Sequence, residues 1–400
     1  MENWSDKIAS QFNTYKNTVY DNLFFSYVGL YALACFIILQ FNLSLHGDEY
    51  HFYPTIITFA SQPFWETLYH YNELTTPLAF IIYAAFGKLT NLDINTLRTA
   101  SIIISAFTLL SIYLLFKNYS THRYVAFFLS ILFSLNPYFM GLSIYVYTDM
   151  LTLLCCVWML LFLRKNNALG YTFMATAALL CRQHTAIIIA SYLGVLLIHF
   201  FYFRKKEALP FIIGSLFSFI ILSILFFYWK NITPNGPMTQ KLNTLPFQYE
   251  LSAISTYLFS IGVYTFPLFF LYSNKIKKIV PLKWLLIPSF IYFLFPIQAA
   301  LCSINDGVFT VGLFHKLVTT TIANDLISNG ILYFFFYLGL CLVGFFILKI
   351  KKNPFTSTLP LLMVSIVAFS IIMPFSFQIW EKYILIILPQ CFILLADTSE

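Results

Sequence analysis

Charged side chains are scarce in this sequence. They account for 10% of the 400 residues, against 60% for hydrophobic and 20% for aromatic residues, whereas a soluble domain carries about 25% charged residues. Apolar segments recur along the whole chain and leave no room for a sizeable soluble domain. This shortage excludes an ordinary soluble protein. It predicts an all-α, polytopic membrane protein organised as a single domain over residues 1–400.

The sequence also lacks a phosphate-binding Gly-rich loop and a metal-binding cysteine pattern. No Gly-rich loop of the kind that cradles nucleotide phosphates occurs. The seven cysteines lack metal-ligand spacing, so they are expected to be small buried residues within or beside apolar segments. The net charge of +7 comes from short basic clusters between apolar segments, which is a positive-inside pattern and does not indicate nucleic acid. The cysteines are Cys35, Cys155, Cys156, Cys181, Cys302, Cys341 and Cys391.

Apolar runs predict about twelve transmembrane helices, with a polar N-terminal stretch before the first. Three of the runs are short for a crossing, which needs about 20 residues. The expected spans are Leu23–Leu45, Leu97–Phe116, Tyr124–Leu142, Leu151–Leu163, Leu169–Leu180, Ala186–Phe203, Phe211–Trp229, Leu251–Tyr272, Trp284–Cys302, Ile331–Leu348, Thr358–Met373 and Tyr383–Leu395.

The first external loop, His46–Pro77, is unusually acidic. It contains Asp48, Glu49, Glu66 and Glu73, four of the 16 acidic residues in the chain. The segment that follows, Leu78–Leu89, is about 12 residues long and too short for a full crossing, which needs about 20 residues. We expect it to form an interfacial or re-entrant helix.

The distribution of basic residues indicates which side of the membrane each loop occupies. If Leu78–Leu89 does not cross and the N-terminus lies inside, 16 of the 23 basic residues fall in inner loops and 7 outside. A full crossing would invert this distribution and violate the positive-inside rule. The first arrangement puts four polar features on the non-cytoplasmic face: the acidic loop, Tyr147–Asp149, Arg182-Gln183 and Trp380–Tyr383.

Each feature also has a purely structural interpretation. Asp48-Glu49 can be a solvated loop start, and Asp149 can cap the helix that follows it. Arg182 can extend to the membrane surface, and Glu381-Lys382 can be a local ion pair. The loop histidines have no metal-ligand spacing, so packing is the expected role of His46, His51 and His70.

Glycosyl transfer from a lipid-linked sugar phosphate is the chemistry that would use these groups together. A carboxylate within hydrogen-bond reach can deprotonate the attacking acceptor hydroxyl. An arginine near the interface can hold the departing phosphate with two hydrogen bonds. The aromatic, apolar spans would surround the polyprenyl chain. This arrangement requires no cofactor and no metal. The sequence leaves open whether a metal ion binds to Asp48, Glu49 and Asp149.

The same residues carry a resemblance to a known family. The acidic pair after the first span, Trp65, Thr75-Thr76-Pro77, the Tyr-Thr-Asp motif and the late Glu-Lys-Tyr motif resemble the GT-C membrane glycosyltransferases. More narrowly, they resemble the dolichyl-phosphate-glucose α-1,2-glucosyltransferase family of N-glycan precursor assembly. That family has Y-T-E and F-R-Q-T-N where this chain has Tyr-Thr-Asp at 147–149 and Cys-Arg-Gln-His-Thr at 181–185.

The resemblance implies a function and a set of site residues. It implies inverting transfer of a hexose, glucose in that family, from a dolichyl- or polyprenyl-phosphate donor to a lipid-linked or other glycan acceptor at the lumenal or periplasmic face. The membrane would be the endoplasmic reticulum in a eukaryote or the inner membrane in a bacterium. By resemblance, the catalytic residues are Asp48 and Glu49, the donor-phosphate residues are Arg182, Gln183 and Lys382, and the pocket residues are Glu73, Tyr147, Asp149 and Glu381.

Other functions remain open at this point. One is a flippase or transporter of lipid-linked sugars, which would often show internal repeats; none is visible in the sequence. Another is a polysaccharide- or lipid-modifying glycosyltransferase that uses a different sugar. A third is an oligosaccharide polymerase or ligase, whose site lies mainly in a large later loop.

Overall fold

The computed structural model describes residues 4–41, 43–120, 122–244, 249–280, 285–300, 303, 307–352, 359–376 and 378–396. Within these residues the chain is all-helical and contains no β-strand, as expected. Its internal contacts divide it into two compact units, one reaching to Cys181 and the other running over Arg182–Ala396. Each unit is described by itself, and the single-domain organisation stays a prediction.

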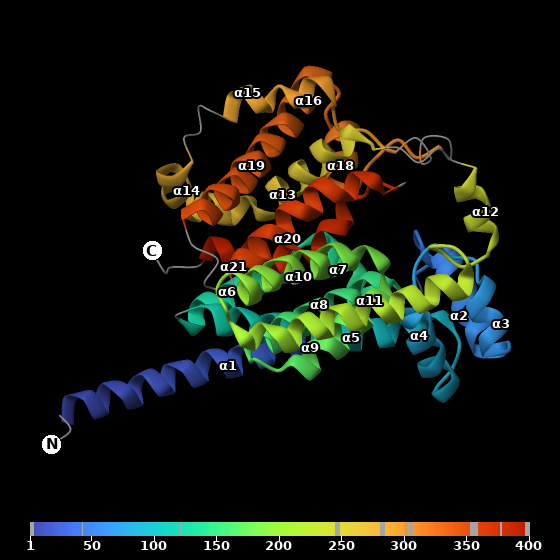
Figure 1. Cartoon of the computed structure of the whole chain (residues 1–400), viewed down its shortest axis with the longest axis horizontal. Coiled ribbons are helices and arrows are strands. Elements are labelled where there is room, and N and C mark those ends of the chain that lie inside the picture. The colour runs from blue at the N-terminus through green and yellow to red at the C-terminus, as the bar shows by residue number, and fades with distance from the viewer. Residues whose placement is uncertain are drawn as a thin grey trace. The chain divides into compact units, whose positions relative to one another are not determined.

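Unit 1 is built around α5, which packs against α1, α6, α7 and α8, while α9 packs along α8. Helices α2, α3 and α4 gather at the end of this unit away from the start of α1 (Figure 1). The helices are α1 (Trp4–Leu39), α2 (Glu49–Ser61), α3 (Phe64–His70), α4 (Leu78–Leu89), α5 (Ile94–Tyr119), α6 (Arg123–Ser134), α7 (Pro137–Ile144), α8 (Thr148–Arg164) and α9 (Ala168–Cys181).

Local sequence signals set the helix ends of unit 1. The Asp93 carboxylate accepts hydrogen bonds at 3.0 Å from the backbone N–H groups of Asn95 and Thr96, which caps α5. Asn136 caps α7 in the same way, and Pro137 occupies its first turn. The expected continuous span Tyr124–Leu142 is therefore two helices, bent by 69° at this Asn-Pro step.

Unit 2 packs α13 against α19 and α10 against α20. Its longer helices are α10 (Ala186–Phe201), α11 (Leu209–Trp229), α13 (Leu251–Leu271), α19 (Asp325–Lys352) and α20 (Leu359–Ile372). Its short elements are η1 (Gln183–Thr185), η2 (Lys206–Ala208), α12 (Pro237–Asn243), α14 (Ser273–Ile279), α15 (Leu286–Ser289), α16 (Ile291–Leu294), α18 (Leu313–Thr321), η4 (Met373–Phe375), η5 (Glu381–Ile386) and α21 (Leu388–Ala396).

Helices α13 and α19 approach each other closely at a pair of glycines. A Cβ atom on Gly262 would overlap the Phe335 carbonyl oxygen, and one on Gly339 would overlap the Leu258 carbonyl oxygen. Small residues allow this backbone contact, as is common between apolar helices in membranes.

Six described helices are long and apolar enough to cross a membrane, or seven if the bent pair α6 and α7 is one span. These several long apolar helices indicate a membrane protein, and they do not confirm the expected count of twelve. The six are Thr18–Leu39, Ile94–Tyr119, Gln183–Phe201, Lys206–Trp229, Leu251–Leu271 and Asp325–Ile350.

Two expected spans are interrupted. The described part of Trp284–Cys302 forms only the one-turn helices α15 and α16, and Pro296 after α16 opposes continuation of the helix; Trp284 and Cys302 lie outside the described residues. Tyr383–Leu395 divides into η5 and α21 beside Pro389. In contrast, α4 coincides with the expected short helix Leu78–Leu89, while its position in the membrane stays a prediction.

The cysteine prediction is confirmed for six positions. Cys35, Cys155, Cys156, Cys181, Cys341 and Cys391 are buried free thiols. Cys302 lies outside the described residues.

Candidate active site

The acidic pair at the start of α2 divides into two different environments. Glu49 is 0% exposed and lies against the equally buried Arg98. Arg98 Nη2 lies 2.6 Å from Glu49 Oε2, and Arg98 Nε lies 3.0 Å from Glu49 Oε1. The Glu49 carboxylate also accepts the backbone N–H groups of Val146 at 2.8 Å and His46 at 3.1 Å. Four donors therefore surround this carboxylate, and this enclosure favours a positioning role for Glu49.

Asp48, the neighbouring residue, keeps an accessible carboxylate. Its side chain is 32% exposed and makes no hydrogen bond that caps α2. Its backbone N–H donates to the Tyr147 hydroxyl at 3.0 Å, and that hydroxyl donates to the His46 carbonyl at 3.2 Å. Tyr147 thus fixes the backbone beneath Asp48, whose side chain is partly exposed.

Gly47 makes this arrangement possible. Its φ angle is +55°, which favours glycine. A Cβ atom at this position would overlap the Tyr147 hydroxyl. The turn that presents Asp48 therefore requires glycine for two independent reasons.

His51, one turn after Asp48, connects it to a buried acid. The His51 Nδ1 atom lies 2.8 Å and 3.0 Å from the two carboxylate oxygens of Glu73. The His51 Nε2 atom lies 3.9 Å from Asp48 Oδ1. The packing role expected for His51 is therefore wrong, because its ring lies between two carboxylates.

Glu73 is almost completely enclosed, with an exposed fraction of 2%. Its carboxylate accepts a hydrogen bond from the Thr55 hydroxyl at 3.2 Å in addition to its contact with His51. Burial raises the pKa of Glu73 above its ordinary value; hydrogen bonds from His51 and Thr55 oppose this, and the charge of Asp48 adds to it. Glu73 therefore supports His51 from inside the protein.

Asp149 is 3% exposed in the first turn of α8. Tyr147, rather than Asp149, is the N-cap residue of that helix, so the alternative interpretation of Asp149 as the cap does not hold. A carboxylate in the first turn still interacts favourably with the positive end of the helix dipole. This burial favours a supporting role for Asp149.

The basic residues predicted to bind phosphate belong to unit 2. Arg182 is 4% exposed, and its guanidinium carbon lies 5.7 Å from the centre of the Tyr383 ring. The His184 ring lies 5.5 Å from the same Tyr383 ring. Both Arg182 and Lys382 lie within electrostatic range of His184. Arg182 therefore lies beside Tyr383, the residue that follows Lys382 in the chain.

Gln183, the third of these residues, begins η1 directly after Arg182 and is half-buried. The backbone at Arg182 is extended, and its carbonyl accepts the Thr185 N–H at 3.1 Å and the Thr185 hydroxyl at 2.8 Å. This short bonded turn holds the Arg-Gln pair at the start of α10.

Glu381 is 0% exposed and supports a neighbouring helix. Its carboxylate accepts the backbone N–H groups of His315 at 2.8 Å and Phe314 at 3.2 Å, which lie in the first turn of α18. It also accepts the Tyr264 hydroxyl at 2.5 Å. The Glu381 carboxylate thus anchors α18 to α13, and its predicted contact with a sugar has no support from this geometry.

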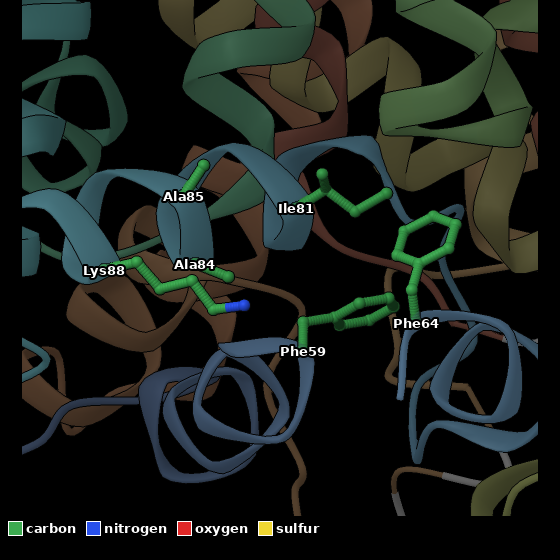
Figure 2. A pocket seen from close by; sticks show the side chains of 6 residues that line it. All are labelled: Phe59, Phe64, Ile81, Ala84, Ala85 and Lys88. Atoms are coloured by element: carbon green, nitrogen blue, oxygen red, sulfur yellow. The ribbon is translucent and has the colours of Figure 1, made fainter. Parts of the chain in front are cut away.

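An apolar pocket of about 150 Å³ lies on the α2–α4 side of unit 1. Figure 2 shows Phe59 and Phe64 opposite side chains of α4, with the Lys88 ammonium turned toward Phe59. Phe59 lies eight residues beyond His51, about 12 Å along α2 at 1.5 Å per residue. The pocket therefore combines apolar walls with one cation.

Within the described residues, no group of three or more His, Cys, Asp or Glu side chains is placed to hold a metal ion. No protein-family model, curated protein or solved structure matches the chain.

The sequence analysis gave Arg98 no role in the site and gave His51 only a packing role. Arg98 had a usable signal, because a charge inside an apolar span usually has a buried partner. His51 had a weaker one: it lies three residues after Asp48, and side chains at that spacing share one face of a helix.

Proposed function

We propose that this protein is a multi-pass membrane glycosyltransferase of the GT-C type. It moves a hexose, glucose by preference, from a polyprenyl- or dolichyl-phosphate donor to a lipid-linked or other glycan acceptor. The observation that carries the proposal is the difference in environment between the Asp48 and Glu49 carboxylates. One carboxylate is locked by four hydrogen bonds, and its neighbour stands accessible on a backbone fixed by Tyr147.

The reaction would be a single in-line displacement. The acceptor oxygen bonds to the anomeric carbon, the bond from that carbon to the phosphate oxygen breaks, and Asp48 takes the hydroxyl proton. Arg182, with Gln183 and Lys382, would stabilise the negative charge that develops on the departing phosphate. Tyr147 would fix the backbone at Asp48, and Glu73 would hold His51 beside it. Asp149 and Glu381 would be buried structural carboxylates rather than sugar contacts.

The proposed sidedness places Asp48, Tyr147 and Arg182 at the lumenal or periplasmic face. The basic segment around α14 would then lie on the cytoplasmic side. A single cysteine introduced at Lys278 should react with a membrane-impermeant maleimide only in inside-out vesicles. Labelling from the outer face would contradict the topology.

The activity test uses the full chain in lipid nanodiscs with a panel of polyprenyl-phosphate sugars. We expect donor-dependent transfer or slow donor hydrolysis by the wild type. Asp48→Asn should lower kcat by about 10²–10⁴-fold, the usual contribution of a general base. Glu66→Gln, an exposed acid of the same loop, is the matched control. An Asp48→Asn variant with wild-type turnover would remove Asp48 as the base.

The phosphate role of Arg182 has a separate readout. Arg182→Ala should lower kcat/KM for the donor and leave KM for the acceptor nearly unchanged. Lys316→Ala, which removes an exposed charge of α18, is the control. Sugar movement across vesicles without any transfer would favour a flippase.

A further inference from the structure

The His51 ring is oriented by its contacts. Its Nδ1 atom lies within hydrogen-bond distance of both Glu73 oxygens, 2.8 Å and 3.0 Å away, and its Nε2 atom faces Asp48. A neutral imidazole that donates Nδ1–H to a carboxylate carries its lone pair on Nε2. His51 therefore presents a proton acceptor toward Asp48.

The buried Glu73 carboxylate favours a positive charge on that ring. With 2% of its side chain exposed, Glu73 has little water to stabilise its charge, and removing the partner of a buried charge is strongly destabilising. An imidazolium at position 51 would lie between Glu73 and Asp48, opposite two carboxylates. The 33% exposure of His51 leaves a route by which the proton can pass on to water.

We propose that His51 receives the proton that Asp48 removes from the acceptor hydroxyl, with Glu73 stabilising the resulting imidazolium. This step rests on the proposed glycosyl transfer. The proton moves from the hydroxyl to the Asp48 carboxylate, then from the Asp48 carboxylic acid to His51 Nε2, and finally to water. Asp48 is thereby restored to a carboxylate for the next turnover.

Other titratable groups lie on the elements that pack against α2. They are Glu66, Tyr69 and His70 on α3, Tyr71 in the following turn, and Tyr83 and Lys88 on α4. The charge of Glu73 acts on Tyr71 and, together with burial, raises the pKa of that phenol. The test must therefore separate the effect of His51 from that of its neighbours, and His70→Gln provides an exposed histidine control in the same loop.

The kinetic test compares kcat over pH 5–9 for the wild type, His51→Gln and His70→Gln. Histidine in isolation titrates near pH 6.5, so wild-type kcat should fall on the acid side as His51 becomes protonated. His51→Gln should lose this acid limb and lower kcat about 10- to 100-fold, less than the full loss of a general base. KM for the donor should change little. Wild-type kcat with an unchanged pH profile in His51→Gln would overturn the inference.

A second measurement does not depend on turnover. The ¹⁵N chemical shifts of His51, assigned by their loss in His51→Gln, report its titration in the intact protein. Asp48→Asn and Glu73→Gln each remove a negative neighbour, so each should lower the pH midpoint. If neither substitution changes the pH midpoint of His51, the proposed coupling of His51 to the two carboxylates is wrong, whatever the transfer activity. A wild type that transfers no sugar, with both midpoints shifted, would overturn the proposed function and leave the coupling intact.

Discussion

The guanidinium of Arg98 and the carboxylate of Glu49 form a two-point contact between side chains that are both 0% exposed. Arg98 also donates to the carbonyls of Leu43 and Ser44, at 2.7 Å and 2.8 Å. The pair therefore ties the segment before α2 to the first turns of α5. Asp48 is placed by this network because it directly precedes Glu49 in the chain.

Removing one partner of this pair should destabilise the protein strongly. Arg98→Met leaves Glu49 buried without its cation, which typically costs about 3–5 kcal/mol. Thermal unfolding in detergent should show the loss. Lys165→Met, at an exposed position at the end of α8, is the control. The double variant Arg98→Met with Glu49→Leu should recover part of the loss, and equal melting of Arg98→Met and Lys165→Met would contradict the buried pair.

Gly47→Ala should distort the turn beneath Asp48. The left-handed conformation costs a non-glycine residue about 1–2 kcal/mol, and the methyl group overlaps the Tyr147 hydroxyl. Transfer should fall while membrane insertion persists. Adding Tyr147→Phe relieves the overlap and should recover part of the activity. Gly141→Ala, where the added methyl has open space, is the control, and an equal effect of both alanine substitutions would refute this account.

The glycine contact of unit 2 predicts a position-dependent effect along α19. Gly339→Ala pushes α19 away from α13 and should destabilise by about 1–3 kcal/mol, the usual cost of overpacking. Gly330→Ala lies in open space on the same helix and should cost far less. The measurement is the unfolding temperature of each of the two variants. If Gly330→Ala were the more damaging, the close approach would be refuted.

Glu73 predicts a pH dependence of stability. Its folded-state pKa lies above the ordinary value of 4.5, so the native state binds more protons than the unfolded state in that interval. Stability should therefore fall as pH rises from 4.5 through the raised pKa. Glu73→Gln should remove this decline in melting temperature, and the exposed Glu66→Gln should retain it. If the decline in melting temperature persists in Glu73→Gln, another titratable group causes it.

The apolar pocket predicts a dependence on donor chain length. Ala85→Trp places a bulky ring in the pocket, so it should reduce the preference for long polyprenyl donors over short-chain analogues. Leu89→Trp adds the same ring at a neighbouring residue that is 87% exposed and does not line the pocket. The ratio of kcat/KM for long and short donors is the measurement. Equal ratios in the two variants would exclude the pocket as a chain site.

The sequence predicted local features well where the signal was local. Helix α4 was expected at Leu78–Leu89 because a short apolar segment follows the acidic loop there, and these are its bounds. The Asn136-Pro137 step is a local signal for a bend as well, but it lies within an apolar run that was predicted to be one continuous span. The interruption of Trp284–Cys302 followed from prolines whose effect hydrophobicity does not reveal.

The different environments of Asp48 and Glu49 were beyond local reasoning. Adjacent residues at a helix start project in different directions, and composition does not tell which one turns inward. The partner that decides it, Arg98, lies 49 residues further on. Likewise, His51 acquires its orientation from Glu73, which is 22 residues away.

The span of contacts around Glu49 also bears on how the chain is made. Its carboxylate needs the Val146 N–H, which is synthesised 97 residues later. At about 5–20 residues per second, that interval is roughly 5–20 s, during which the acid lacks one of its final donors. The loop that presents Asp48 therefore reaches its finished form only after α5, α6 and α7 have been made. A ribosome stalled before Val146 would hold a nascent chain whose loop is still incompletely bonded.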